Sequence, residues 1–138
     1  MVDPDILRRK TAQVLHHCNR LERRASLDRT ALEGDEDLLN TVLMDLQQAI
    51  QGCIDLAAHQ CADDQLGAPA TPAEAFALIA RHGTIEPELA RRLTAASGLR
   101  NLIVHQYTAL DLDRILKAMR DDLDDLRRFV AAVHRPAA

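Results

Sequence analysis

Aromatic side chains are scarce in this chain: it has no tryptophan, one tyrosine and two phenylalanines among 138 residues. Hydrophobic residues nevertheless make up 47% of the sequence, so the core must be built from leucine, alanine, isoleucine and valine. Glycine and proline are also few, at five each, and this composition favours helices over strands. We therefore expect an all-α protein.

Cysteine pairs and long apolar runs are missing as well. Cys18, Cys53 and Cys61 are an odd number without a C-x-x-C spacing, which indicates reduced thiols and not a disulfide framework. No apolar run approaches the ~20 residues of a transmembrane helix, and the segment MVDPDILRRK lacks the apolar region of a secretion signal. The sequence thus predicts a soluble, cytoplasmic protein.

An excess of positive charge is absent too. The net charge is −4 and the pI is about 5.8, so any contact with nucleic acid needs a local basic patch. There is no glycine-rich phosphate loop. Adjacent His16 and His17 point about 100° apart on a helix, and zinc spacing with His59 and Cys61 is missing. We expect neither a metal nor a cofactor.

The apolar pattern predicts two long helices in the first half of the chain. The first begins near Asp3–Pro4 and ends in the polar stretch RRASLDRTALEGDED, residues 23–37. The second runs from about Glu36 to Cys61. The apolar stripes that predict them have helical spacing: Leu7, Val14, Cys18 and Leu21 in the first, and Leu39, Val42, Leu43, Leu46, Ile50, Cys53, Ile54 and Ala57 in the second.

Three further helices are expected in the second half. A short one follows the cap Thr71–Pro72 and ends before Gly83. The next begins near Glu86–Pro87 and is either split by Gly98 or ends near Tyr107, and the last spans residues 112–133. The whole chain, residues 1–138, is thus predicted to be one domain, an up-and-down bundle of four long helices and a short one.

The stretch LRNLIVHQYTALD, residues 99–111, holds the candidate site. On a continuous helix Asn101 and His105 share one face within about 40°, whereas Arg100 and His105 lie about 140° apart. One helix therefore does not aim both at a small target. A second copy across a two-fold axis would gather two arginines and two histidines into one groove, which points to a homodimer.

Histidine and arginine together suit cleavage of RNA without a metal. The imidazole of His105 can accept or donate a proton near neutral pH, and the guanidinium of Arg100 can stabilise charge that develops on phosphorus. Asn101 would orient the imidazole or hold the backbone. The competing interpretation is structural: His105 near a helix end interacts with the helix dipole, and Tyr107 packs its ring on the core.

The segment RNLIVHQY resembles the R-x-x-x-x-H-x-Y motif of HEPN-domain (HepT-like) ribonuclease toxins, the partners of minimal nucleotidyltransferase (MNT) antitoxins in type VII systems. LQQAIQGCIDLAAH, TPAEAFALIARHGTIEPELARRL and LDDLRRFV are similar to that family in order and spacing. The resemblance implies a homodimeric HEPN bundle and a metal-independent endoribonuclease with Arg100 and His105 as the catalytic pair, supported by Asn101. It also implies that the antitoxin attaches AMP to Tyr107 and so inactivates the toxin.

Two other functions stay open at this point: a non-catalytic accessory subunit of a nucleotidyltransferase, and a plain dimerisation bundle. The sequence does not identify the RNA, although transfer RNA is plausible for the family. Asp55 and His59, four residues apart, form a possible acid–histidine pair on the second helix. Asp55 is also a candidate for the lining of the groove.

Overall fold

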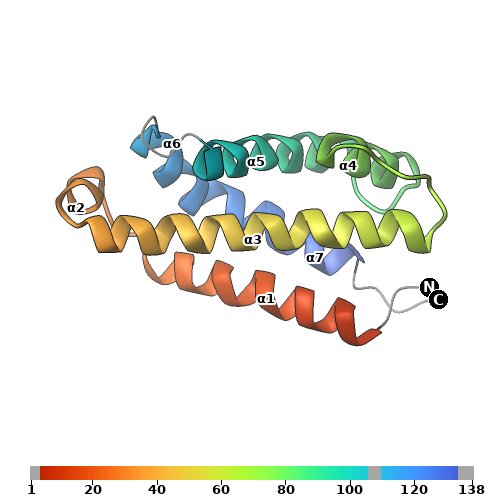
Figure 1. Ribbon diagram of the computed structural model, residues 1–138, viewed down its shortest axis with the longest axis horizontal. Helices are drawn as coiled ribbons and strands as arrows, with labels where there is room; N and C mark the ends of the chain where they lie inside the picture. The colour runs from red at the N-terminus through yellow and green to blue at the C-terminus, as the bar shows by residue number, and fades with distance from the viewer. Residues whose placement is uncertain (1–3, 106–109, 134–138) are drawn as a thin grey trace.

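The computed structural model describes residues 4–105 and 110–133, and these ranges are helical without a strand (Figure 1). The long helix α3 (Glu36–Asp63) runs through the middle of the bundle, with α1 (Pro4–Arg23) on one side and α5 (Pro87–His105) on the other. Each described helix contributes buried apolar side chains to one core cluster. The all-α bundle predicted from composition is confirmed.

The antiparallel pair α1 and α3 forms the base of the bundle. Val14, Cys18 and Leu21 of α1 are fully buried, as their spacing predicts. Gly52 of α3 lets the two helices approach closely, because a Cβ at this position would lie 2.5 Å from Cγ2 of Val14. That distance is far inside van der Waals contact, so the glycine is required by packing.

The helix α4 (Pro72–Arg81) has the predicted termini. Thr71 Oγ1 accepts a hydrogen bond from the Glu74 amide at 3.1 Å, and the Glu74 carboxylate accepts one from the Ala70 amide at 2.7 Å. Gly83, with a φ of +93°, ends the helix in a conformation that favours glycine. Phe76 of α4 meets Phe129 edge to face, with ring centroids 5.4 Å apart, and so ties this corner to the C-terminal helix.

The polar stretch between the first two long helices contains a helix that the sequence pattern did not predict, α2 (Arg29–Gly34). Asp28 caps it by accepting a hydrogen bond from the Ala31 amide at 2.9 Å. Leu32 is buried in the core, and Arg29 donates to the Asp113 carboxylate at 3.1 Å. Tertiary contacts therefore stabilise a helix that is too short to be stable alone.

The second half of the chain settles one alternative and differs from the prediction in its last helix. Helix α5 continues through Gly98 without a break, so the alternative of a split helix is wrong. The last helix consists of α6 (Leu112–Lys117), a π-helical turn η2 (Ala118–Asp122) and α7 (Leu123–Val133). Periodicity does not reveal such a turn, because the apolar spacing remains three and four. None of the described helices is long and apolar enough to cross a membrane.

Candidate functional site

Helix α5 carries the described part of the candidate motif. Pro87 occupies its first position and Glu88 its first turn, which suits the start of a helix. A buried apolar face then anchors the helix against its neighbours and fixes the direction of the polar positions; its largest members are Leu89, Leu93, Leu99 and Ile103. Because Ile103 is buried within the motif itself, the orientations of Arg100 and His105 are set by core packing.

Arg100 is half-buried, and its guanidinium is held by its neighbour in the sequence. Its Nη1 donates a hydrogen bond to Oδ1 of Asn101 at 2.9 Å. Its Nε is buried and has no hydrogen-bond partner.

His105 is the last residue of α5, and its side chain is exposed. Within the described part of the chain no residue accepts or donates a hydrogen bond to its ring. The side-chain amide of Asn101 contacts Arg100, a contact that differs from both roles considered for Asn101 in the sequence. Tyr107 lies outside the described residues.

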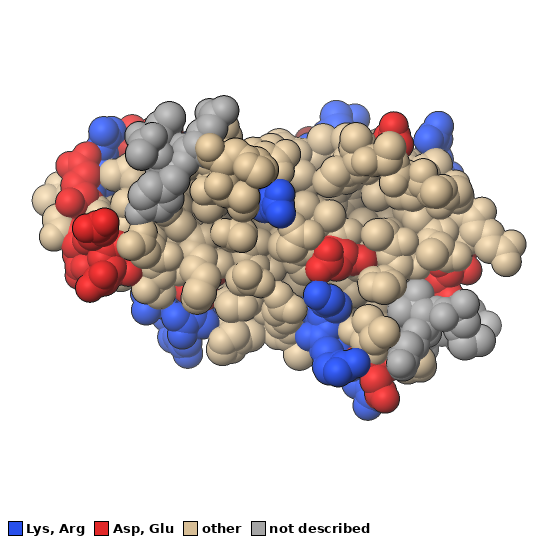
Figure 2. Space-filling model, viewed as in Figure 1, with Lys and Arg blue, Asp and Glu red and all other residues tan. Residues whose placement is uncertain are grey.

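Arg100 and His105 do not converge within one protomer. Five positions on a continuous helix separate their directions by about 140°, and α5 is continuous across both residues. Val104, one turn after Arg100, is 39% exposed, and Met44 of the adjacent helix α3 is 46% exposed. Figure 2 shows that the face over α3 and α5 is largely uncharged in this view. Large exposed apolar side chains beside a polar motif are typical of an interface.

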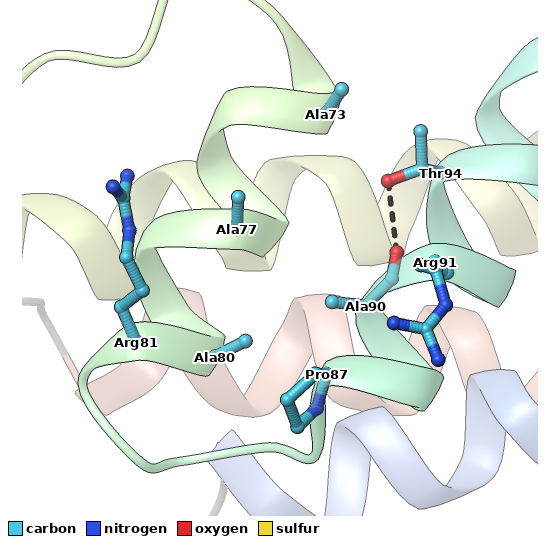
Figure 3. A pocket seen from close by; sticks show the side chains of 8 residues that line it. All are labelled: Ala73, Ala77, Ala80, Arg81, Pro87, Ala90, Arg91 and Thr94. Atoms are coloured by element: carbon cyan, nitrogen blue, oxygen red, sulfur yellow. Dashed lines mark hydrogen bonds between the residues drawn. The ribbon is translucent and has the colours of Figure 1, made fainter.

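The cavity of about 560 Å³ between α4 and α5 is separate from the motif (Figure 3). Alanine, proline and threonine side chains line it, and Arg81 and Arg91 stand at its edges. Neither a histidine, a cysteine nor a carboxylate belongs to its lining, so it has no group for acid–base chemistry.

A second cavity, of about 540 Å³, lies between α5 and the C-terminal helix and is polar. Arg114 pairs with Asp122 at 3.2 Å, and Arg92 pairs with Asp125 at 3.4 Å. Burial raises the pKa of Asp122, and the charge of Arg114 opposes that rise. The opposite charges that line this cavity are matched in number, which leaves no local excess for an ion.

A cluster of charged side chains around a buried carboxylate lies between α1 and α3, where the sequence pattern did not predict a site. Asp45 is fully buried, and three bases surround its carboxylate: two from α1 and Arg24, which directly follows that helix. His17 Nδ1 lies 2.7 Å from Oδ1, Arg20 Nε donates to both carboxylate oxygens at 2.9 and 3.1 Å, and Arg24 Nη1 lies 3.9 Å from Oδ2. The signal was present as an aspartate inside the apolar stripe of α3 and as bases spaced three and four apart along α1 and the residue after it.

Asp55 also has a different partner from the one considered. Its carboxylate accepts hydrogen bonds from Lys10 Nζ of α1 at 3.0 Å and from Gln51 Nε2 at 2.9 Å. It therefore belongs to a row of polar contacts between α1 and α3, together with the amide pair Gln13–Gln48. Among the described residues no group of three or more His, Cys, Asp or Glu is placed to hold a metal ion.

Comparison with known proteins gives consistent matches over the bundle. The model of the family "Ribonuclease HepT-like" matches residues 14–133. The chain is 30% identical to the mRNA nuclease HepT of Shewanella oneidensis, over 94% of this chain and 96% of that protein. It is 29% identical to the tRNA nuclease HepT of Aphanizomenon flos-aquae, over 87% of this chain and 80% of that protein.

Solved structures agree with these sequence matches. A tri-AMPylated HEPN toxin of Shewanella oneidensis in complex with MNT antitoxin superimposes with a TM-score of 0.85 at 30% identity, over 95% of this chain and 98% of that one. A toxin–antitoxin with AMP-PNP gives a TM-score of 0.86 at 29% identity, over 95% and 99%. The bundle is thus a HEPN fold, the predicted class. The chain belongs to the HepT-like ribonuclease family.

Proposed function

We propose that this chain is the toxin of a toxin–antitoxin pair, a metal-independent endoribonuclease that acts as a homodimer. The observation that carries the proposal is the arrangement on α5 of a half-buried arginine, held by Asn101, and, five residues later, an exposed histidine. The matched family is one of ribonucleases, and relatives named as nucleases cover most of the chain. Both facts support cleavage of RNA.

In the proposed reaction, the ribose 2′-oxygen attacks phosphorus and the bond to the 5′-oxygen breaks. One His105 imidazole takes the proton of the 2′-hydroxyl or gives a proton to the leaving 5′-oxygen. The two sites of a dimer would supply both roles. Arg100 donates hydrogen bonds to the phosphoryl oxygens as their negative charge grows.

Asn101 has a positioning role in this scheme. Its Oδ1 accepts a hydrogen bond from Arg100 Nη1 and so restricts the guanidinium to one orientation. The exposed apolar side chains Met44 and Val104 are the proposed contact between the protomers. A dimer across that face brings together the groups that one helix points apart.

The test is cleavage of RNA by the purified protein in the presence of EDTA. We expect cleavage to persist with the chelator, and His105→Ala to lower the rate by at least about a hundredfold. The control is His82→Ala, because His82 is exposed at the end of α4 and outside the motif. Loss of cleavage in EDTA would reject metal independence. Equal activity of His105→Ala and the parent would reject the assigned role.

The proposed regulation is AMPylation of Tyr107 by a cognate nucleotidyltransferase. A tri-AMPylated HEPN toxin with MNT antitoxin is among the similar structures, which supports this assignment. The added nucleotide is bulky and negatively charged, and it would repel an RNA backbone beside the groove. After co-expression with the nucleotidyltransferase, intact mass should increase in AMP-sized steps. Tyr107→Phe should prevent the increase and keep the toxin active; an unchanged increase would reject Tyr107 as the acceptor.

The same cleavage assay can determine which class of RNA is the substrate. One relative is named an mRNA nuclease and another a tRNA nuclease. Parallel digestion of total tRNA and of a messenger transcript, followed by mapping of the 5′-hydroxyl ends, would identify the substrate. Absence of cleavage of both RNAs by the protein purified without the nucleotidyltransferase, together with stable binding of that enzyme, would favour the accessory-subunit alternative.

A further inference from the structure

Positive charge is in local excess at one place on α1. Elsewhere in the described chain, cations commonly face a carboxylate of their own: Lys10 pairs with Asp55 at 3.0 Å, and Arg127 pairs with Glu22 at 3.1 Å. At the C-terminal half of α1, three bases share the single carboxylate of Asp45. Glu22 does not neutralise them, because it is engaged by Arg127.

The three bases do not use all of their hydrogen-bonding groups on the carboxylate of Asp45. An ionised carboxylate only accepts, so His17 donates its Nδ1–H and its Nε2 is left without a partner among the described residues. Arg20 uses only its Nε on Asp45. Arg24 lies 3.9 Å away, beyond hydrogen-bond distance, so its guanidinium N–H groups remain available. The side chains of Arg20 and Arg24 are 28% and 30% exposed, so they reach the surface.

This cluster is one helix away from the candidate motif. The C-terminal ends of α1 and α5 both lie along the first half of α3, on opposite sides of it (Figure 1). An α-helix with its side chains is about 10–12 Å across, a distance that a strand of a few nucleotides spans. A nuclease with a net charge of −4 needs several local phosphate contacts to hold a polyanion at physiological salt.

From this arrangement we infer that His17, Arg20 and Arg24 form a phosphate-binding subsite that holds the RNA strand beside the cleavage site. The inference rests on the proposed ribonuclease function and names a further contact for its substrate. Asp45 is the positioning residue: it fixes the bases before RNA arrives, so less side-chain entropy is lost on binding. Arg24 is the main anion contact, because it is the base that Asp45 holds least tightly.

The experiment measures binding of a short, labelled single-stranded RNA to the His105→Ala dimer across a series of NaCl concentrations. In this background, Arg24→Gln should weaken binding by about three- to tenfold and make the slope of log K against log salt shallower by about 0.7, the value for one lost phosphate contact. Arg24→Lys keeps the charge and should keep the slope. In the protein with His105, Arg24→Gln should raise KM and leave kcat within about twofold.

The control is Arg91→Gln, which removes the same charge from an exposed arginine at the other end of α5, where it pairs with Glu88. It should leave RNA affinity within about twofold. Equal weakening by Arg91→Gln would show a net-charge effect and overturn the subsite. Unchanged binding and slope for Arg24→Gln, in a protein that cleaves RNA, would overturn the subsite alone. If the parent protein neither binds nor cleaves RNA, the subsite and the proposed function are both rejected.

Discussion

At the scale of single residues, the contact between Arg100 and Asn101 links two neighbours of the motif. A guanidinium on a flexible chain samples many orientations, and one hydrogen bond at 2.9 Å selects among them. We expect Asn101→Ala to lower kcat for RNA cleavage by about tenfold with little change in thermal stability, because Asn101 is exposed. Single-turnover kinetics and thermal unfolding measure the two effects. A parent-like kcat would show that Asn101 does not position Arg100.

The buried thiols give a residue-scale prediction about pH. Burial raises the pKa of Cys18 from 9.0 to about 11, with a smaller opposing effect from Arg127. Between pH 9 and 11 the unfolded thiol therefore ionises while the folded thiol remains protonated. The folded state then binds more protons, so the free energy of unfolding must fall as pH rises, by up to about 1.4 kcal/mol per pH unit from this group.

Urea unfolding at several pH values between 8 and 11 checks this effect, with Cys18→Ala as the comparison. The variant loses a buried side chain and should be less stable at every pH, but its stability should depend less on pH in that range. Parallel pH profiles for the two proteins would contradict the assignment.

At the scale of elements, the close approach of α1 and α3 depends on Gly52. Gly52→Ala places a methyl group 2.5 Å from Val14 Cγ2, and the β-branched, buried valine has little freedom to move away. Overpacking costs about 1–3 kcal/mol, and the helix preference of alanine returns up to about 1 kcal/mol. We expect a net loss of about 1–2 kcal/mol in urea unfolding.

Gly98→Ala is the matched control for that substitution. Gly98 also lies within a helix, but an added Cβ there would meet no atom within 4 Å. The substitution should stabilise the protein by about 0.5–1 kcal/mol through helix preference. Destabilisation by both alanines to the same extent would contradict the packing argument for Gly52.

The Asp45 cluster is the second contact that joins these two helices. Asp45→Asn keeps the shape of the side chain and removes its charge, so the hydrogen bonds from Arg20 and His17 lose their ionic component. We expect a loss of about 1.5–3 kcal/mol in the free energy of unfolding. The control is Asp55→Asn, whose side chain is 32% exposed beside Lys10 and should cost less than about 1 kcal/mol. Equal losses of unfolding free energy in the two variants would show that the buried carboxylate contributes no more to stability than the partly exposed one.

At the scale of the whole molecule, the proposed dimer uses the exposed apolar face of α3 and α5. Val104→Lys would place a charge where the partner protomer is expected, so it should produce monomers and abolish cleavage while leaving the helical content unchanged. Light scattering after gel filtration and circular dichroism measure this. Leu15→Lys is the control, since Leu15 on α1 has a similar exposed fraction, 36%. A dimer that persists in Val104→Lys would place the interface elsewhere.

Much of this architecture could be predicted from the sequence because helix positions and helix ends depend on residues that are close together in the chain. Apolar spacing predicted the long helices, and Thr71 and Gly83 marked the ends of α4. Helix α2 was not predicted, since its stability depends on Leu32 reaching a distant core and on Arg29 contacting Asp113. The π-helical turn has no signal in the apolar spacing.

The motif on α5 and the cluster around Asp45 differ in the same respect, the distance along the chain between their residues. The motif on α5 is contiguous, so its residues could be named from the sequence and from the family resemblance. The cluster around Asp45 joins residues 21 to 28 positions apart, and only the packing of α1 on α3 brings them together. Asp55 shows the risk of local reasoning: its carboxylate accepts from Gln51 on the preceding turn and from Lys10, 45 positions away, and not from His59 on the next turn.

The row of polar contacts between α1 and α3 also determines the register in which the two helices pack. Lys10 meets Asp55, Gln13 meets Gln48, and His17 with Arg20 meets Asp45. The fit of Val14 against Gly52 already opposes a slide by one turn, although most of the apolar stripe repeats at that interval. Such a slide would set Asp45 against an amide in place of its cations, so the charged row makes one alignment of the helices far more stable than its neighbours.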